Sequence, residues 1–88
     1  MKEEIKLRPE VQWFAEQMEL KLRENDHKGG WADCLIEHLL RQVPREYREL
    51  LKALLWDDLP DEVIREAADI ANYAMMIADR HRNWEKEE

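Results

Sequence analysis

Residues 60–82 read PDEVIREAADIANYAMMIADRHR, and this stretch decides the fold because its apolar spacing is that of one long amphipathic helix. Pro60 suits the first turn of a helix, and Asp57, Asp58 and Leu59 before it have the composition of a turn. A wide apolar arc runs along the helix: Val63, Ile64, Ala67, Ile70, Ala71, Ala74, Ile77 and Ala78. Its four alanines form a small-residue stripe that would let another helix approach closely.

Two further helical segments precede this one. Residues 10–25 follow Pro9, which again suits a first turn. This segment has two apolar sides, one with Val11, Phe14, Met18 and Leu22, the other with Trp13 and Leu20. The glycine-containing loop 25–31, read NDHKGGW, ends it.

Residues 32–56 form the second helical segment, which contains Pro44. A proline inside a helix removes a hydrogen bond and crowds the turn before it, so the segment either kinks or splits into two helices. We expect a kink, because one apolar stripe continues through the proline: Ile36, Leu40, Val43, Tyr47, Leu50 and Leu54.

The composition supports one all-α domain over residues 1–88, with residues 1–8 and 83–88 frayed. The chain has two glycines, three prolines and 44% hydrophobic residues, which favours helix over disorder. We expect a bundle of about four helices that oligomerisation completes. A chain this short covers only about 60–65% of its unfolded surface, and the first helix is apolar on two sides, so we predict a homodimer or homotetramer.

Charge and hydropathy exclude several function classes. The formal net charge of −7 disfavours binding to a nucleic acid polymer, although a small phosphorylated ligand with a metal remains compatible. No apolar run approaches the ~18 residues of a membrane span. The single cysteine, Cys34, cannot form an intrachain disulfide, which fits a reducing compartment. We therefore expect a cytoplasmic protein.

Two pairs of carboxylates are the main chemical signal. Glu46 and Glu49 lie three residues apart, as do Glu66 and Asp69 on the last helix, and residues at this spacing are neighbours on a helix surface. If the two helices face each other, the four like charges repel unless a cation lies between them. Mg²⁺ prefers such oxygen ligands, and Mn²⁺ is an alternative. The competing interpretation is a solvated acidic face, which the position of Asp69 opposite the apolar arc favours.

The motifs resemble those of the MazG-like, all-α nucleotide pyrophosphohydrolases. REYREL at residues 45–50 and EAAD at residues 66–69 resemble that family's EExxE and ExxD motifs. HKGGW at residues 27–31 is similar to the HKGxW loop of phage and bacterial members, and residues 66–79 resemble their last-helix signature. The resemblance covers roughly residues 10 to 82.

The resemblance implies hydrolysis of a nucleoside triphosphate between its α and β phosphates, giving a monophosphate and pyrophosphate. It implies that Glu46, Glu49, Glu66 and Asp69 are Mg²⁺ ligands and catalytic residues. Arg45 stands where the family's first motif begins with glutamate, which would weaken activity if that glutamate assists in activating water.

Four residues are candidate substrate contacts, each with a structural alternative. Lys28 could reach a phosphate or be an ordinary exposed lysine. Trp31 could stack on a base or anchor its loop to the core. Asn72 could hydrogen-bond a ligand or lie on a polar face, and a base could pack on Tyr73.

Two other functions stay open. One is a catalytically degenerate nucleotide-binding or interaction module, and the other is a purely structural acidic helical oligomer.

Overall fold

The structure of the chain is a computed structural model, and it describes residues 4–83. Between these residues it contains three α-helices and no strand, in the order α1 (Pro9–Glu24), α2 (Ile36–Lys52) and α3 (Pro60–Arg82). A short 3-10 helix, η1 (Asp26–Lys28), follows α1, and a π-helical turn, η2 (Ala53–Asp57), extends α2. The all-α class is confirmed. The single chain provides three long helices in this range rather than about four, and Pro44 lies inside α2 without dividing it.

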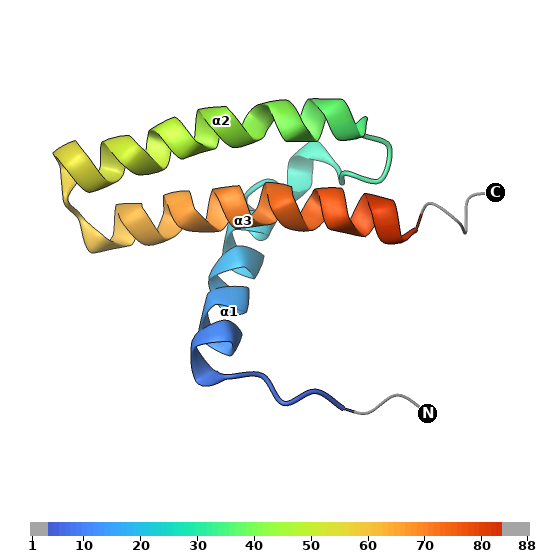
Figure 1. The fold of residues 1–88 in the computed structure, drawn as a ribbon, viewed down its shortest axis with the longest axis horizontal. Coiled ribbons are helices and arrows are strands. Elements are labelled where there is room, and N and C mark those ends of the chain that lie inside the picture. Colours follow the sequence, from blue (N-terminus) through green and yellow to red (C-terminus); the bar gives the residue numbers. More distant parts are fainter. Residues whose placement is uncertain (1–3, 84–88) are drawn as a thin grey trace.

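The long helices are arranged around α3. The antiparallel helices α2 and α3 lie side by side, and α1 crosses behind α3 at a steep angle (Figure 1). Asp58 takes a left-handed conformation, with φ of 46°, and its N–H donates to the Ala53 carbonyl, which closes the turn between α2 and α3. Because α3 packs against both other helices, its two flanks are partly covered.

The boundaries of the elements agree with the sequence except around the loop. The last helix spans the predicted residues, and α1 is displaced by one residue at each end. The second helix begins at Ile36 instead of residue 32, because Cys34 N–H turns back to the Trp31 carbonyl before the helix starts. Residues 1–3 and 84–88, predicted to be frayed, lie outside the described residues. Asn83 is tied to the end of α3 by its amide, which donates to the Asp79 carbonyl.

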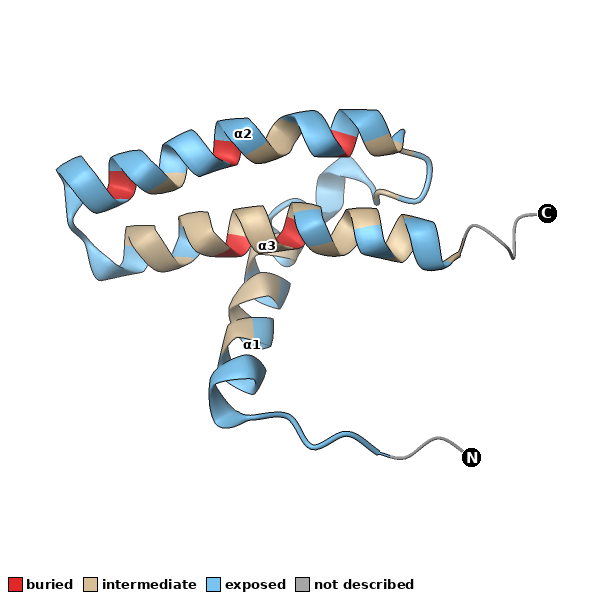
Figure 2. Cartoon of the chain, in the orientation of Figure 1, coloured by how far each residue is buried: buried red, intermediate tan, exposed pale blue. Residues whose placement is uncertain are grey.

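The buried residues of α2 lie on the side of the helix that faces α3 (Figure 2). The buried residues of α3, Ala68 and Asn72, lie instead toward α1, where Asn72 hydrogen-bonds the Met18 carbonyl. The side that faces α3 holds Leu39 and Glu46 of α2 and Ala53 of η2, which are seven residues apart and therefore share one side of the continuous helical segment. The predicted apolar stripe is wrong for Leu40 and for two further residues on its flank, Tyr47 and Leu54, all of which are more than half exposed. Glu46 thus places a carboxylate at the centre of the side that faces α3.

Much apolar surface stays uncovered in the single chain. The radius of gyration is 14.8 Å, against roughly 12 Å for a compact domain of this length. The exposed large apolar side chains are Ile5, Leu7, Val11, Trp13, Leu20, Leu35, Leu40, Tyr47, Leu51, Leu54, Leu55, Trp56 and Leu59. They include Trp13 and Leu20, the second apolar side predicted for the first helix. Among the described residues, no helix is both long and apolar enough to cross a membrane.

Candidate metal and phosphate site

Three of the four predicted carboxylates come together between α2 and α3. Glu46 from α2 and Glu66 and Asp69 from α3 each offer one oxygen atom, and these atoms all lie within 4.8 Å of one another. The arrangement follows from the helices: Glu46 is on the side of α2 that faces α3, and Glu66 and Asp69 are one turn apart on α3. We call these three residues the carboxylate cluster.

The fourth carboxylate, Glu49, lies outside this cluster and is exposed to solvent. Its charge nevertheless contributes to a raised pKa of Glu66, so it is close enough to act on the cluster electrostatically. Asp69 is not on a solvated face, because its helix lies between α2 and α1 and its side chain is only 23% exposed. The pattern on α3 alone did not reveal this second packed flank.

Two acids of the cluster, Glu66 and Asp69, have raised pKa values. Burial raises the pKa of Glu66, and the neighbouring charges of Asp69, Glu46 and Glu49 raise it further. Burial also raises the pKa of Asp69, where the charge of Glu46 acts in the same direction and Lys21 opposes both. Both shifts have the sign expected for acids that are crowded and partly removed from water.

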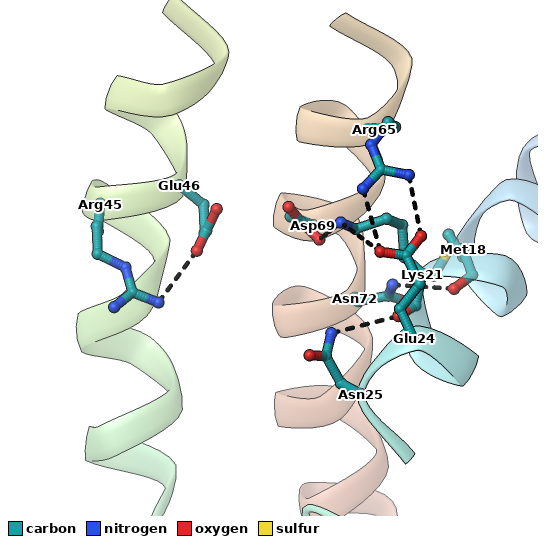
Figure 3. Close-up of polar contacts among 9 residues, drawn as sticks. All are labelled: Met18, Lys21, Glu24, Asn25, Arg45, Glu46, Arg65, Asp69 and Asn72. Atoms are coloured by element: carbon teal, nitrogen blue, oxygen red, sulfur yellow. Dashed lines mark hydrogen bonds and ion pairs between the residues drawn. The ribbon is translucent and has the colours of Figure 1, made fainter. Parts of the chain in front are cut away.

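Two cations approach the cluster from opposite sides (Figure 3). The Lys21 ammonium on α1 lies 3.5 Å from Asp69 Oδ1, and the Arg45 guanidinium donates to Glu46 Oε1 at 3.1 Å. Within residues 4–83, Arg45 pairs with Glu46 and not with Glu49, its neighbour one helical turn further along. Glu66 has no ion pair within the same range.

Lys21 was not a candidate from the sequence. It lies in an ordinary-looking charged position of the first helix, 48 residues before Asp69, and only the docking of α1 on α3 brings the two together. Local spacing carries no signal for such a contact.

The donor set suits a hard divalent cation. All three groups are carboxylates, they come from two facing helices, and among the described residues two cations, Lys21 and Arg45, form ion pairs with them. Mg²⁺ and Mn²⁺ favour such oxygen ligands and keep water or substrate phosphate in their remaining positions. The residues present therefore fit Mg²⁺ or Mn²⁺.

A pocket of about 180 Å³ adjoins the cluster between α1 and α3. Its lining consists of Lys21, Leu22, Asn25, Lys28, Asp69, Asn72, Tyr73 and Met76. Three of the four predicted substrate contacts, Lys28, Asn72 and Tyr73, thus share one pocket with Asp69. We call it the α1–α3 pocket. A pocket of about 190 Å³ beside it shares Leu22, Asn25 and Met76 and is walled by the loop at Trp31.

Asn72 is buried, not on a polar face. It is 4% exposed, and its Nδ2 donates to the Met18 carbonyl at 3.0 Å, which ties α3 to α1. Its NH₂ group is therefore engaged in packing the two helices. Its Oδ1 is also buried and finds no hydrogen-bond partner within residues 4–83.

Trp31 is held by α3. Its indole Nε1 donates to Asp79 Oδ2 at 3.0 Å, which agrees with the anchoring interpretation of this residue. Arg82 donates to the other oxygen of the same carboxylate at 2.7 Å. The hydrogen bonds from Trp31 and Arg82 lower the pKa of Asp79. Gly29, with φ of 87°, provides the left-handed turn that connects this anchor to Lys28.

Comparison with known proteins gives no match to a family model, to a curated protein or to a solved structure. The carboxylate cluster, the α1–α3 pocket and the motifs at residues 45–50 and 66–69 are therefore the features that bear on function.

Proposed function

We propose that this chain is a Mg²⁺-dependent nucleoside triphosphate pyrophosphohydrolase, which cleaves between the α and β phosphates and releases pyrophosphate. The observation that carries the proposal is the carboxylate cluster, with oxygen atoms within 4.8 Å of one another, beside a pocket lined by two lysines. The resemblance of residues 45–50 and 66–69 to the MazG-like motifs supplies the reaction type.

Each carboxylate has a definite task in this proposal. Glu46, Glu66 and Asp69 would hold Mg²⁺ or Mn²⁺ directly, and Glu49 would add negative charge from the exposed side. When bound, the metal would neutralise phosphate charge and lower the pKa of an attacking water. The protein's contribution is to keep three acids close together despite their repulsion, so that they are ready for a cation.

The α1–α3 pocket would take the nucleotide. Tyr73 and Met76 give it apolar walls on which a base can pack, and Lys28 provides an ammonium for the phosphate chain. Because Asp69 belongs to both the pocket and the cluster, phosphates bound here would lie next to the metal site. Trp31 acts by holding the loop that carries Lys28, and Asn72 acts by fixing α1 against α3.

One contact favours a second candidate, a nucleotide-binding module with little or no turnover. Arg45 donates to Glu46 at 3.1 Å and so uses one oxygen atom of the proposed metal ligand. It also stands where the resembled motif has glutamate. Both facts predict slow hydrolysis of the nucleotide. In the extreme case, the chain would bind a nucleotide without hydrolysing it.

We further propose that the working form is a homodimer or homotetramer. Apolar side chains such as Leu40, Leu54 and Trp56 are more than half exposed, and large exposed apolar patches typically mark protein–protein contacts. The α1–α3 pocket is also smaller than the roughly 300–1,000 Å³ of typical ligand sites, as expected if a second copy completes it. A single folded monomer by light scattering at micromolar concentration would contradict this assembly.

The test is a panel of ribo- and deoxyribonucleoside triphosphates assayed for pyrophosphate with and without Mg²⁺. We expect Mg²⁺-dependent release with at least one of them, and loss of release in Glu66→Gln. The matched control is Glu19→Gln, which removes an exposed carboxylate of α1 that pairs with Arg23. If nucleotides raise the melting temperature without any release of pyrophosphate, the binding-module candidate is favoured. If they do neither, the proposed function is wrong.

A further inference from the structure

Lys21 lies in an unusual position for a lysine. Its ammonium is 3.5 Å from Asp69 Oδ1 and 3.5 Å from Glu24 Oε1, and its side chain is only 15% exposed. Long charged side chains usually keep their charged group in water, so a lysine this well covered is held by its partners. Figure 3 shows it extending from α1 to α3.

Its two partners differ in how firmly they are already bound. Glu24 forms a bidentate fork with the guanidinium of Arg65, which donates hydrogen bonds of 2.9 and 3.1 Å to its two carboxylate oxygens. Within residues 4–83, Asp69 forms no such fork, and it belongs to the carboxylate cluster. The contact of Lys21 with Asp69 is therefore the one that a second cation would disturb.

We propose that Lys21 has two alternating roles: it neutralises Asp69 when the cluster holds no metal, and it binds a phosphate group when the cluster is loaded. A divalent cation at Asp69 would repel the nearby ammonium and take over its partner. The α1–α3 pocket, which Lys21 lines together with Lys28, is the adjacent space into which the ammonium can turn. Two ammonium groups on one pocket, next to a metal, fit the oxygen atoms of a phosphate or pyrophosphate group. This inference rests on the proposed function, because it needs the cluster to bind metal.

The two roles predict effects of opposite sign. In the absence of phosphate, Lys21 competes with the metal for Asp69, so removing the lysine should tighten metal binding. In the presence of phosphate, Lys21 is one of its ligands, so removing the lysine should weaken phosphate binding. A lysine that only supports the packing of α1 on α3 would weaken both when lost.

The experiment measures the two affinities separately in the full chain by isothermal titration calorimetry. Mg²⁺ is titrated alone, and inorganic pyrophosphate is then titrated at saturating Mg²⁺, into the parent, Lys21→Met and the control Lys52→Met. Lys52 is an exposed lysine at the end of α2 and lines none of the pockets described above. For Lys21→Met we expect Mg²⁺ to bind several-fold more tightly and pyrophosphate about tenfold more weakly, the loss typical of one charge-assisted hydrogen bond. The control should leave both affinities unchanged.

Circular dichroism of each variant checks its helix content, and Lys21→Gln replaces Lys21→Met if the latter does not fold. A folded variant with unchanged pyrophosphate affinity, or with both affinities weakened equally, overturns the two roles of Lys21 while the proposed function stands. A parent that binds no Mg²⁺ overturns the proposed function and this inference together.

Discussion

Replacing Glu66 by glutamine should make the metal-free protein more stable and at the same time remove its stabilisation by Mg²⁺. Glu66 is the cluster residue without an ion pair in the described part of the chain, and its oxygen lies within 4.8 Å of those of Glu46 and Asp69. The glutamine keeps the shape of the side chain and removes only its charge.

The magnitude follows from the geometry. Two unit charges 4.8 Å apart repel by about 3.5 kcal/mol at an effective dielectric constant near 20, and by about 0.9 kcal/mol in bulk water. Glu66 is only partly buried, so solvent screens part of this repulsion. We therefore expect a gain of about 1–3 kcal/mol in the free energy of unfolding, or roughly 4–8 °C in melting temperature for each kcal/mol.

The assay is urea denaturation at neutral pH in chelator and then in excess Mg²⁺. The parent should gain about 2.7 kcal/mol when Mg²⁺ is at a hundred times its dissociation constant, and Glu66→Gln should gain far less. Glu19→Gln is the control, because it removes an exposed ion pair worth about 0.2–1 kcal/mol and leaves the cluster intact. If Glu66→Gln is less stable than the parent in chelator, or responds to Mg²⁺ as the parent does, the cluster is an ordinary acidic surface.

Three further predictions concern the groups around the cluster. Arg45→Glu restores the resembled motif and should raise pyrophosphate release; a folded variant that binds Mg²⁺ but loses activity would mean that the arginine assists turnover. Asp79→Asn weakens the anchor of the loop tryptophan, so trypsin should cleave after Lys28 several-fold faster, and an unchanged cleavage rate would argue against the anchor. The pKa values of Glu66 and Asp69 are raised in the folded chain, so the folded chain keeps protons that the unfolded chain releases. The contribution of these two acids to metal-free stability is therefore largest below their unfolded pKa values. This contribution declines as the pH rises through their folded pKa values. The stability difference between the parent and Glu66→Gln/Asp69→Asn, followed against pH in chelator, checks this sign, and a parent that gains relative to the double variant as pH rises would refute it.

The bounds of the helices were predictable from local patterns where a proline or a regular apolar spacing marks the helix. Pro60 in a first turn and the apolar arc after it predicted the bounds of α3. The prediction that Pro44 lies inside one helix is confirmed, although three members of the apolar stripe on which it rested are exposed. The pattern did not show which part of the second helix faces α3. Leu40 satisfies the apolar period as well as Leu39 does, and only packing decides that Leu39 is buried and Leu40 exposed.

Most residues of the candidate site were predictable from the sequence, including Lys28 and Arg45, but Lys21 was not. The i, i+3 spacing of Glu66 and Asp69 predicted that their side chains are neighbours. It did not predict that Glu46 joins them and that Glu49 lies outside the cluster, because this depends on how α2 packs against α3. Lys21 contacts Asp69 across 48 residues of sequence, a relation that no local period encodes. The partial burial of Asp69 was missed for the same reason, since it depends on where α1 crosses α3.

The most direct test of the central claim is ³¹P NMR of a nucleoside triphosphate incubated with the protein and Mg²⁺. If the chain is a pyrophosphohydrolase, the triphosphate signals of an accepted nucleotide give way to those of a nucleoside monophosphate and pyrophosphate. The conversion should stop in Asp69→Asn and in chelator. Nucleoside diphosphate and inorganic phosphate as products, or no conversion of any nucleotide by a protein shown to bind Mg²⁺, would contradict the claim.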